Sequence, residues 1–137
     1  MKEPITPKKI MIVEDNVINQ KMSKKIVILL GHEPIQVLEA KKSFATAKEQ
    51  KPDLILMDTK FPDACGVEIC RSIKNDPELQ DVPIILIKHS QDAETPQQII
   101  EQSNCDECLS KPFSLDIFSE AIGKYVKCKA INWDKKK

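Results

Sequence analysis

The chain has 137 residues, of which 21 are basic and 21 acidic, and 41% are hydrophobic. This length suits one domain with a buried core, and the balanced charge argues against a disordered chain or an electrostatic nucleic-acid binder. No apolar run approaches the length of a membrane span, and the N-terminus has no signal-peptide core, so we expect a cytoplasmic protein without a membrane or nucleic-acid partner.

Short apolar runs alternate with stretches of helical periodicity along almost the whole chain. In chain order, we expect strands at residues 8–13, 35–38, 54–57, 82–87 and 105–110, and helices at 17–30, 41–50, 65–74, 94–103 and 115–126. Five repeats of strand and helix predict a doubly wound α/β fold, in which helices cover both faces of a five-stranded parallel sheet. Residues 1–7 are expected to be a flexible leader, and residues 128–137 a basic tail.

Several residues suit the beginnings and ends of these helices. Asn16 and Ser114 are good N-caps for the first and last helix, and Gly31 can close the first. The first helix also has apolar residues at helical spacing. They are Val17, Ile18, Met22, Ile26, Leu29 and Leu30.

Charged residues directly follow four of the expected strands. Glu14 and Asp15 follow the first strand, Asp58 the third, Lys88 the fourth and Lys111 the fifth. Because the carboxyl ends of parallel strands share one edge of the sheet, where ligands bind in open α/β folds, we expect these side chains to converge. Three carboxylates repel one another unless a cation lies between them, which predicts Mg²⁺, and a nearby lysine could neutralise a phosphoryl group carried on a carboxylate.

The five cysteines have no spacing typical of a disulfide framework. Cys105 and Cys108 form an isolated C-x-x-C pair, and neither of the two histidines is close to it in the sequence. We interpret the pair as two small, partly buried residues and not as a redox or zinc site.

The charged residues and their neighbours resemble a known family. The matching segments are Glu14-Asp15-Asn16, Asp58 with Pro62 and Gly66 at their offsets, and Lys111-Pro112-Phe113. Together they resemble the receiver domain of two-component response regulators, over about residues 8–127. The resemblance implies a flavodoxin-like (βα)5 fold, and the segment after Val13 is similar to single-domain receivers and to the receiver modules of hybrid kinases and phosphorelays.

The resemblance also implies a role for each matching residue. Asp58 would accept a phosphoryl group from a sensor histidine kinase or a histidine phosphotransfer protein. Glu14, Asp15 and Asp58 would hold Mg²⁺ together with the backbone carbonyl of Lys60, and Lys111 would contact the phosphoryl oxygens. The domain would then be a phosphoacceptor and not an enzyme, apart from self-phosphorylation and self-dephosphorylation.

Two positions depart from the family pattern, and both belong to its conformational switch. Lys88 stands where the family has a Thr or Ser whose hydroxyl moves to the phosphoryl group. The Lys88 ammonium could neutralise that group, could pair with Asp58 beforehand, or could point away and leave Ser90 to supply a hydroxyl. Cys108 stands where a Tyr or Phe ring turns inward, so this aromatic coupling cannot operate.

We therefore consider two functions of different kinds. The first is a stand-alone receiver that relays its signal to a downstream protein through the face of the fourth helix, fifth strand and fifth helix, or passes the phosphoryl group onward. We expect no output domain, because the resemblance covers nearly the whole of the sequence. The alternative is a degenerate receiver that binds proteins independently of phosphorylation, which Lys88 and Cys108 favour. A hydrolase is disfavoured because Lys60 stands where such enzymes usually place a second acid.

Overall fold

The computed structural model describes residues 5–131, and its strands and helices alternate as the sequence predicts. The strands are β1 (Lys9–Val13), β2 (Glu33–Val37), β3 (Leu54–Asp58), β4 (Ile84–His89) and β5 (Glu107–Lys111). The helices are α1 (Val17–Leu29), α2 (Ser43–Gln50), α3 (Gly66–Lys74), α4 (Pro96–Ser103) and α5 (Leu115–Gly123). No helix within residues 5–131 has the length and hydropathy to cross a membrane. The first four residues of the predicted leader and residues 132–137 of the predicted tail lie outside the described residues.

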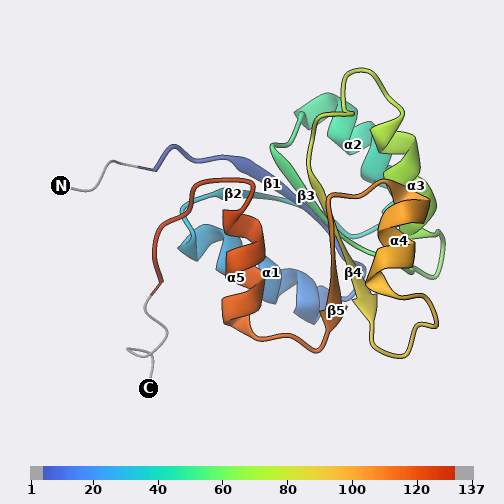
Figure 1. The fold of residues 1–137 in the computed structure, drawn as a ribbon. Coiled ribbons are helices and arrows are strands. Elements are labelled where there is room, and N and C mark those ends of the chain that lie inside the picture. The colour runs from blue at the N-terminus through green and yellow to red at the C-terminus, as the bar shows by residue number, and fades with distance from the viewer. Residues whose placement is uncertain (1–4, 132–137) are drawn as a thin grey trace.

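The five strands form one parallel sheet in the order β2-β1-β3-β4-β5, which confirms the predicted doubly wound α/β fold. Helices α1 and α5 cover one face of the sheet, and α2, α3 and α4 cover the other (Figure 1). The strand order changes direction between β1 and β3. Open α/β sheets bind ligands at such a point, beyond the carboxyl ends of the strands.

The central strand β3 is buried along its whole length, as expected for a strand between two helical layers. Its side chains alternate between two apolar clusters. Leu54 and Leu56 pack on the side of α1 and α5, and Ile55 and Met57 pack on the side of α2, α3 and α4. The strand that carries Asp58 is therefore held by packing on both faces.

Helix α1 turns much of its apolar sequence to solvent. Val17, Ile18 and Met22 are 57%, 69% and 54% exposed, whereas Ile26 and Leu30 are buried. Apolar residues occur on more than one side of this helix, so helical spacing alone does not identify the side that packs on the sheet. The exposed residues form an apolar surface near the N-terminus of α1, close in sequence to Glu14 and Asp15.

The predicted caps are confirmed, with small shifts of the strand bounds. The side chain of Asn16 accepts a hydrogen bond from the backbone of Asn19, and that of Ser114 accepts one from Ile117. Gly31 follows α1 with a φ of 96°, a left-handed conformation that glycine adopts without strain. Strand β5 begins two residues later than predicted, because the backbone N–H of Cys105 donates to the Ser103 hydroxyl and holds Cys105 in the turn.

The segment after α5 remains attached to the domain as far as the structure describes it. The backbone N–H of Lys129 donates to the carbonyl of Leu30 at 2.8 Å. Cys128 and Ile131 pack against the apolar cluster beneath α1 and α5. Residues 128–131, predicted to belong to a tail, thus add to the packing of the domain.

Candidate functional site

Three carboxylates converge at the carboxyl edge of the sheet, as the sequence predicts. Glu14 and Asp15 follow β1, and Asp58 is the last residue of β3. Each offers an oxygen that lies within 4.8 Å of the others. Lys111, the last residue of β5, places its Nζ 3.6 Å from Glu14 Oε1 and 3.8 Å from Asp58 Oδ1. Parallel strands with turns at the same edge bring together residues that are far apart in the sequence.

The cluster concentrates negative charge in a poorly solvated place. Asp58 is 4% exposed and Glu14 is 6% exposed. The pKa of Asp58 is raised to about 7: burial is the largest cause, the Glu14 charge adds to it, and the Lys111 ammonium partly opposes both. A divalent cation among these oxygens would relieve the repulsion, and an all-carboxylate donor set fits a hard cation such as Mg²⁺.

Mg²⁺ affinity should therefore depend on pH. Between about pH 8 and pH 6 we expect the affinity to fall, because a proton on Asp58, whose pKa is raised to about 7, competes with the cation. Calorimetric titration at several pH values measures this, and Asp58→Asn should lose the dependence in this range. An affinity of the wild type that stays constant between these pH values would contradict the prediction.

Gly66 allows the loop between β3 and α3 to pass close to the backbone of Asp58. The backbone N–H of Gly66 donates to the carbonyl of Thr59 at 2.7 Å, and a Cβ on Gly66 would overlap the carbonyl oxygen of Asp58. Within this loop the backbone groups of Phe61 and Ala64 hydrogen-bond to each other. The Lys60 side chain pairs with Asp92, and metal ligation by the Lys60 carbonyl stays a prediction.

Lys88, Ser90 and Cys108 do not join the carboxylate cluster. The Lys88 ammonium is buried and donates to the carbonyl of His89 at 2.9 Å, and within residues 5–131 it makes no ion pair with Asp58. Ser90 is exposed in the turn after β4, and Cys108 is half-buried beside the apolar cluster of α2, α3 and α4. The structure therefore does not contain the pairing of Lys88 with Asp58 that we considered.

The sequence analysis missed Gln20, which supports the Glu14 turn from inside α1. Gln20 is 1% exposed, and its Nε2 lies 3.1, 3.1 and 3.2 Å from the carbonyl oxygens of Ile12, Glu14 and Val37. Buried polar groups need such partners. The sequence carried no clear signal for this role, because α1 contains several other polar residues, and only the tertiary structure shows that Gln20 faces the sheet.

Gln20→Leu should destabilise the fold and loosen the metal site together. Loss of the amide leaves carbonyls at the end of β1 without this donor, so we expect the free energy of unfolding to fall by about 1–3 kcal/mol. Mg²⁺ binding should also weaken, because the Glu14 backbone loses an anchor. Urea unfolding and Mg²⁺ titration measure the two effects. The exposed Gln97→Leu is the matched control, and equal behaviour of the two variants would rule out this role.

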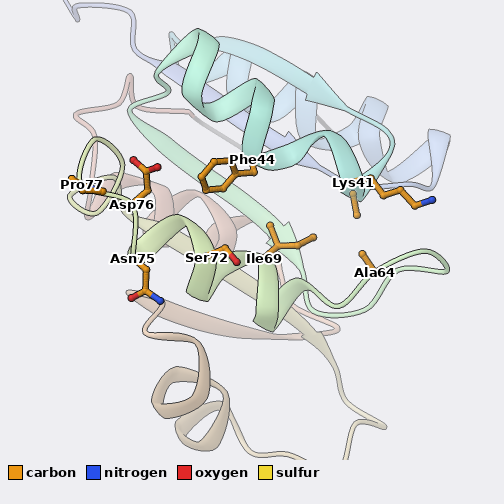
Figure 2. A pocket seen from close by; sticks show the side chains of 9 residues that line it. Lys41, Phe44, Ala64, Ile69, Ser72, Asn75, Asp76 and Pro77 are labelled. Carbon is orange, nitrogen blue, oxygen red and sulfur yellow. The ribbon is translucent and has the colours of Figure 1, made fainter.

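A hollow of about 620 Å³ lies apart from these residues, between α2 and α3. Phe44 of α2 and Ile69 of α3 face each other across it, with Lys41 and Asp76 near its two ends (Figure 2). It contains none of the carboxylates or lysines of the cluster. A smaller groove of about 290 Å³ does adjoin the cluster: Glu14 and Lys111 line it together with Met22 and Phe113.

The doubly wound α/β fold, with an acidic cluster and a lysine at the carboxyl edge of the sheet, is the arrangement expected of a receiver domain. The family model of the response regulator receiver domain matches residues 10–123, and the chain belongs to this family of signalling receiver domains. It is 35% identical over 120 residues to the polar-differentiation response regulator DivK of Brucella anthropi, which covers 88% of this chain and 97% of that protein.

Solved structures share the fold of this chain. A putative response regulator from Chloroflexus aurantiacus superposes with a TM-score of 0.80 at 18% identity, over 88% of this chain and 98% of that one. The receiver domain of the Pseudomonas aeruginosa sensor histidine kinase PA1611 has a TM-score of 0.77 at 25% identity, with the same coverage. That structure has a magnesium ion coordinated in its active-site cleft.

Proposed function

We propose that this chain is a stand-alone phosphoacceptor receiver. Asp58 accepts a phosphoryl group from the phosphohistidine of a sensor histidine kinase or a histidine phosphotransfer protein, with Mg²⁺ held by Glu14, Asp15 and Asp58. The signal then passes to a downstream protein by contact or by onward transfer. The observation that carries the proposal is the convergence of three carboxylate oxygens within 4.8 Å, with the Lys111 ammonium beside them.

The chemistry needs little from the domain beyond position and charge. An Asp58 carboxylate oxygen forms the new bond to phosphorus while the bond from phosphorus to the donor nitrogen breaks, and the histidine keeps the electron pair. Mg²⁺, when bound, supplies charge neutralisation to the transferred group. Lys111 lies between Glu14 and Asp58, where its ammonium can contact a phosphoryl oxygen. Such positioning and electrostatic stabilisation account for most of the catalysis of phosphoryl transfer.

The surface around the site suits a protein donor. Ile18 and Met22 of α1 and Leu115 and Ile117 of α5 are exposed apolar side chains. The groove of about 290 Å³ runs between these two helices and reaches Glu14. Exposed apolar surfaces of this kind often mark the places where another protein binds. We infer that the donor covers this surface.

The face of α4, β5 and α5, through which a downstream protein would bind, is mostly polar on α4 and β5. Among the described residues, the large exposed apolar side chains do not include any on α4 or β5. That part of the face carries polar groups, including Gln97, Glu101 and the ion pair of Lys124 with Glu107. A partner that binds there would be recognised chiefly by hydrogen bonds and charge.

The alternative is a receiver that binds its partners regardless of phosphorylation. The position of Lys88, buried and turned to the His89 carbonyl, favours it, because residue 88 then offers no hydroxyl to the phosphoryl group. The intact carboxylate cluster favours the phosphoacceptor.

Labelling with acetyl phosphate tests the proposal directly. Intact mass after incubation with Mg²⁺ and acetyl phosphate should show one phosphoryl adduct, and a chelator should prevent it, because the buried carboxylates repel the incoming group without the cation. No adduct on folded protein, either from acetyl phosphate or from histidine phosphotransfer proteins, would favour the phosphorylation-independent module.

A further inference from the structure

Lys88 carries a buried charge whose hydrogen-bonding capacity is largely unused. The residue is 5% exposed, and its Nζ donates to the carbonyl of His89 at 2.9 Å. Within residues 5–131 it has no ion-pair partner. An ammonium has three donors, and a buried one is costly unless it meets an anion or several acceptors. Lys88 therefore has much to gain from an anion that arrives nearby.

The Lys88 side chain lies on the same side of the sheet as Cys108. Strands β4 and β5 are paired so that Leu86 faces Cys108 and Lys88 faces Ser110. Paired residues in parallel strands point to the same face, and alternate residues along a strand share it. The Lys88 charge also lowers the pKa of the Cys108 thiol, although burial, the larger effect, raises that pKa to about 11. The long, flexible side chain of Lys88 on β4 and the small side chain of Cys108 on β5 therefore lie on the same face of the sheet.

The turn after β4, whose His89 carbonyl accepts the hydrogen bond from Lys88, does not depend on that bond. The His89 carbonyl also accepts from the backbone N–H of Asp92 at 3.0 Å. The Asp92 carboxylate is held by the His89 backbone at 3.2 Å, by Lys60 Nζ at 2.9 Å and by the Thr59 hydroxyl at 3.3 Å. Departure of the Lys88 ammonium would therefore leave no orphaned carbonyl and would not unfasten the turn.

We propose that Lys88 is the residue that responds to phosphorylation: its ammonium turns from the His89 carbonyl to the phosphoryl group on Asp58 and vacates the space beside Cys108. This inference rests on the proposed phosphoacceptor function. Asp58 is paired with Ile87, and by alternation both point to the opposite face of the sheet from Lys88. Lys88 lies one residue further along the adjacent strand, a step of about 3.3 Å along the strand and about 4.8 Å across the sheet, so its ammonium reaches the phosphoryl group beyond the carboxyl ends of the strands. The four-carbon stem of lysine can span that step.

The direction of the change follows from charge. A phosphoryl group adds almost two negative charges and three acceptor oxygens, and hydrogen bonds between an ammonium and such oxygens are among the strongest in proteins. One hydrogen bond to a carbonyl that keeps its other donor is lost in exchange. The space left beside Cys108 then changes the surface of β5 and α4. The family moves two side chains, a hydroxyl and an aromatic ring, whereas here Lys88 alone would move.

Nuclear magnetic resonance with beryllofluoride, a phosphoryl analogue, tests the proposal in the presence of Mg²⁺. In the wild type, saturating beryllofluoride should shift the amide signals of His89 and Cys108. In Lys88→Met we expect the affinity for beryllofluoride to fall about tenfold or more, and the Cys108 shift to disappear. Lys124→Met removes an exposed lysine that pairs with Glu107 on β5, and it should behave as the wild type.

Thermal unfolding without the analogue separates this role from a structural one. Met fills a similar volume and removes a buried charge, so Lys88→Met should be at least as stable as the wild type. Wild-type affinity for beryllofluoride in Lys88→Met, or an unchanged Cys108 shift in that variant, would overturn the inference. If wild-type Asp58 neither binds beryllofluoride nor forms an adduct with acetyl phosphate, the proposed function fails and the inference falls with it.

Discussion

Asp58→Asn is expected to abolish phosphoryl labelling while making the unliganded protein more stable. The amide has no anionic oxygen to attack phosphorus, so no adduct should form. The carboxylate it replaces has a pKa raised to about 7 by burial and by the Glu14 charge, against an ordinary value of 3.8. The folded wild type therefore binds a proton more tightly than the unfolded chain, and it loses stability as the pH rises from 3.8 to about 7.

Above that range the wild type should be less stable than Asp58→Asn. At about pH 8 without divalent cations, we expect the free energy of unfolding of the variant to exceed that of the wild type by about 1–2 kcal/mol. The gain should vanish below about pH 3, where Asp58 is protonated in both the folded and the unfolded state and the asparagine of the variant carries no charge in either. Loss of labelling in a more stable protein identifies Asp58 as the acceptor and excludes unfolding as the cause.

Intact mass and urea unfolding at the two pH values measure these effects. The control is Asp63→Asn, which removes an exposed carboxylate in the loop after β3 and should leave the adduct intact. An adduct that persists on Asp58→Asn would place the acceptor elsewhere. A less stable Asp58→Asn at high pH would show that the Asp58 charge is better compensated than its burial implies.

Gly66→Ala should be the most damaging single-methyl substitution near the site. The added Cβ would overlap the carbonyl oxygen of Asp58 and crowd the backbone of Thr59. Relaxation is blocked on both sides, because Asp58 belongs to a fully buried strand and the Gly66 N–H is bonded to Thr59. We expect the free energy of unfolding to fall by about 3 kcal/mol, and Mg²⁺ binding to weaken as Asp58 is displaced.

Gly123→Ala is the matched control for this substitution. Gly123 is the last residue of α5, and a Cβ there would meet no atom within 4 Å. Alanine favours the helix, so this variant should gain about 0.5–1 kcal/mol. Urea unfolding of the two variants gives the comparison. Equal stabilities would mean that the loop under Asp58 can move aside, contrary to its hydrogen bonding.

The sequence alone determined the architecture and most of the site. Apolar runs too short for helices, separated by helical periodicity, predicted five strands and five helices in the correct order. Glu14, Asp15, Asp58 and Lys111 were predicted to meet because each follows a strand, and the carboxyl ends of parallel strands share one edge. These properties are local in the chain or follow from topology, so neither required knowledge of side-chain contacts.

Only the tertiary structure decided how the remaining polar side chains are used. Gln20 faces the sheet and bonds the Val37 carbonyl, while apolar residues of α1 face solvent. Asp92 anchors the turn after β4 through Thr59, 33 residues earlier, and Lys88 turns to His89 and not to Asp58. Such choices depend on which groups from distant segments supply the missing hydrogen bonds and space. Hydrophobic periodicity encodes burial of a segment, but the partner of a buried polar group exists only once the segments have packed together.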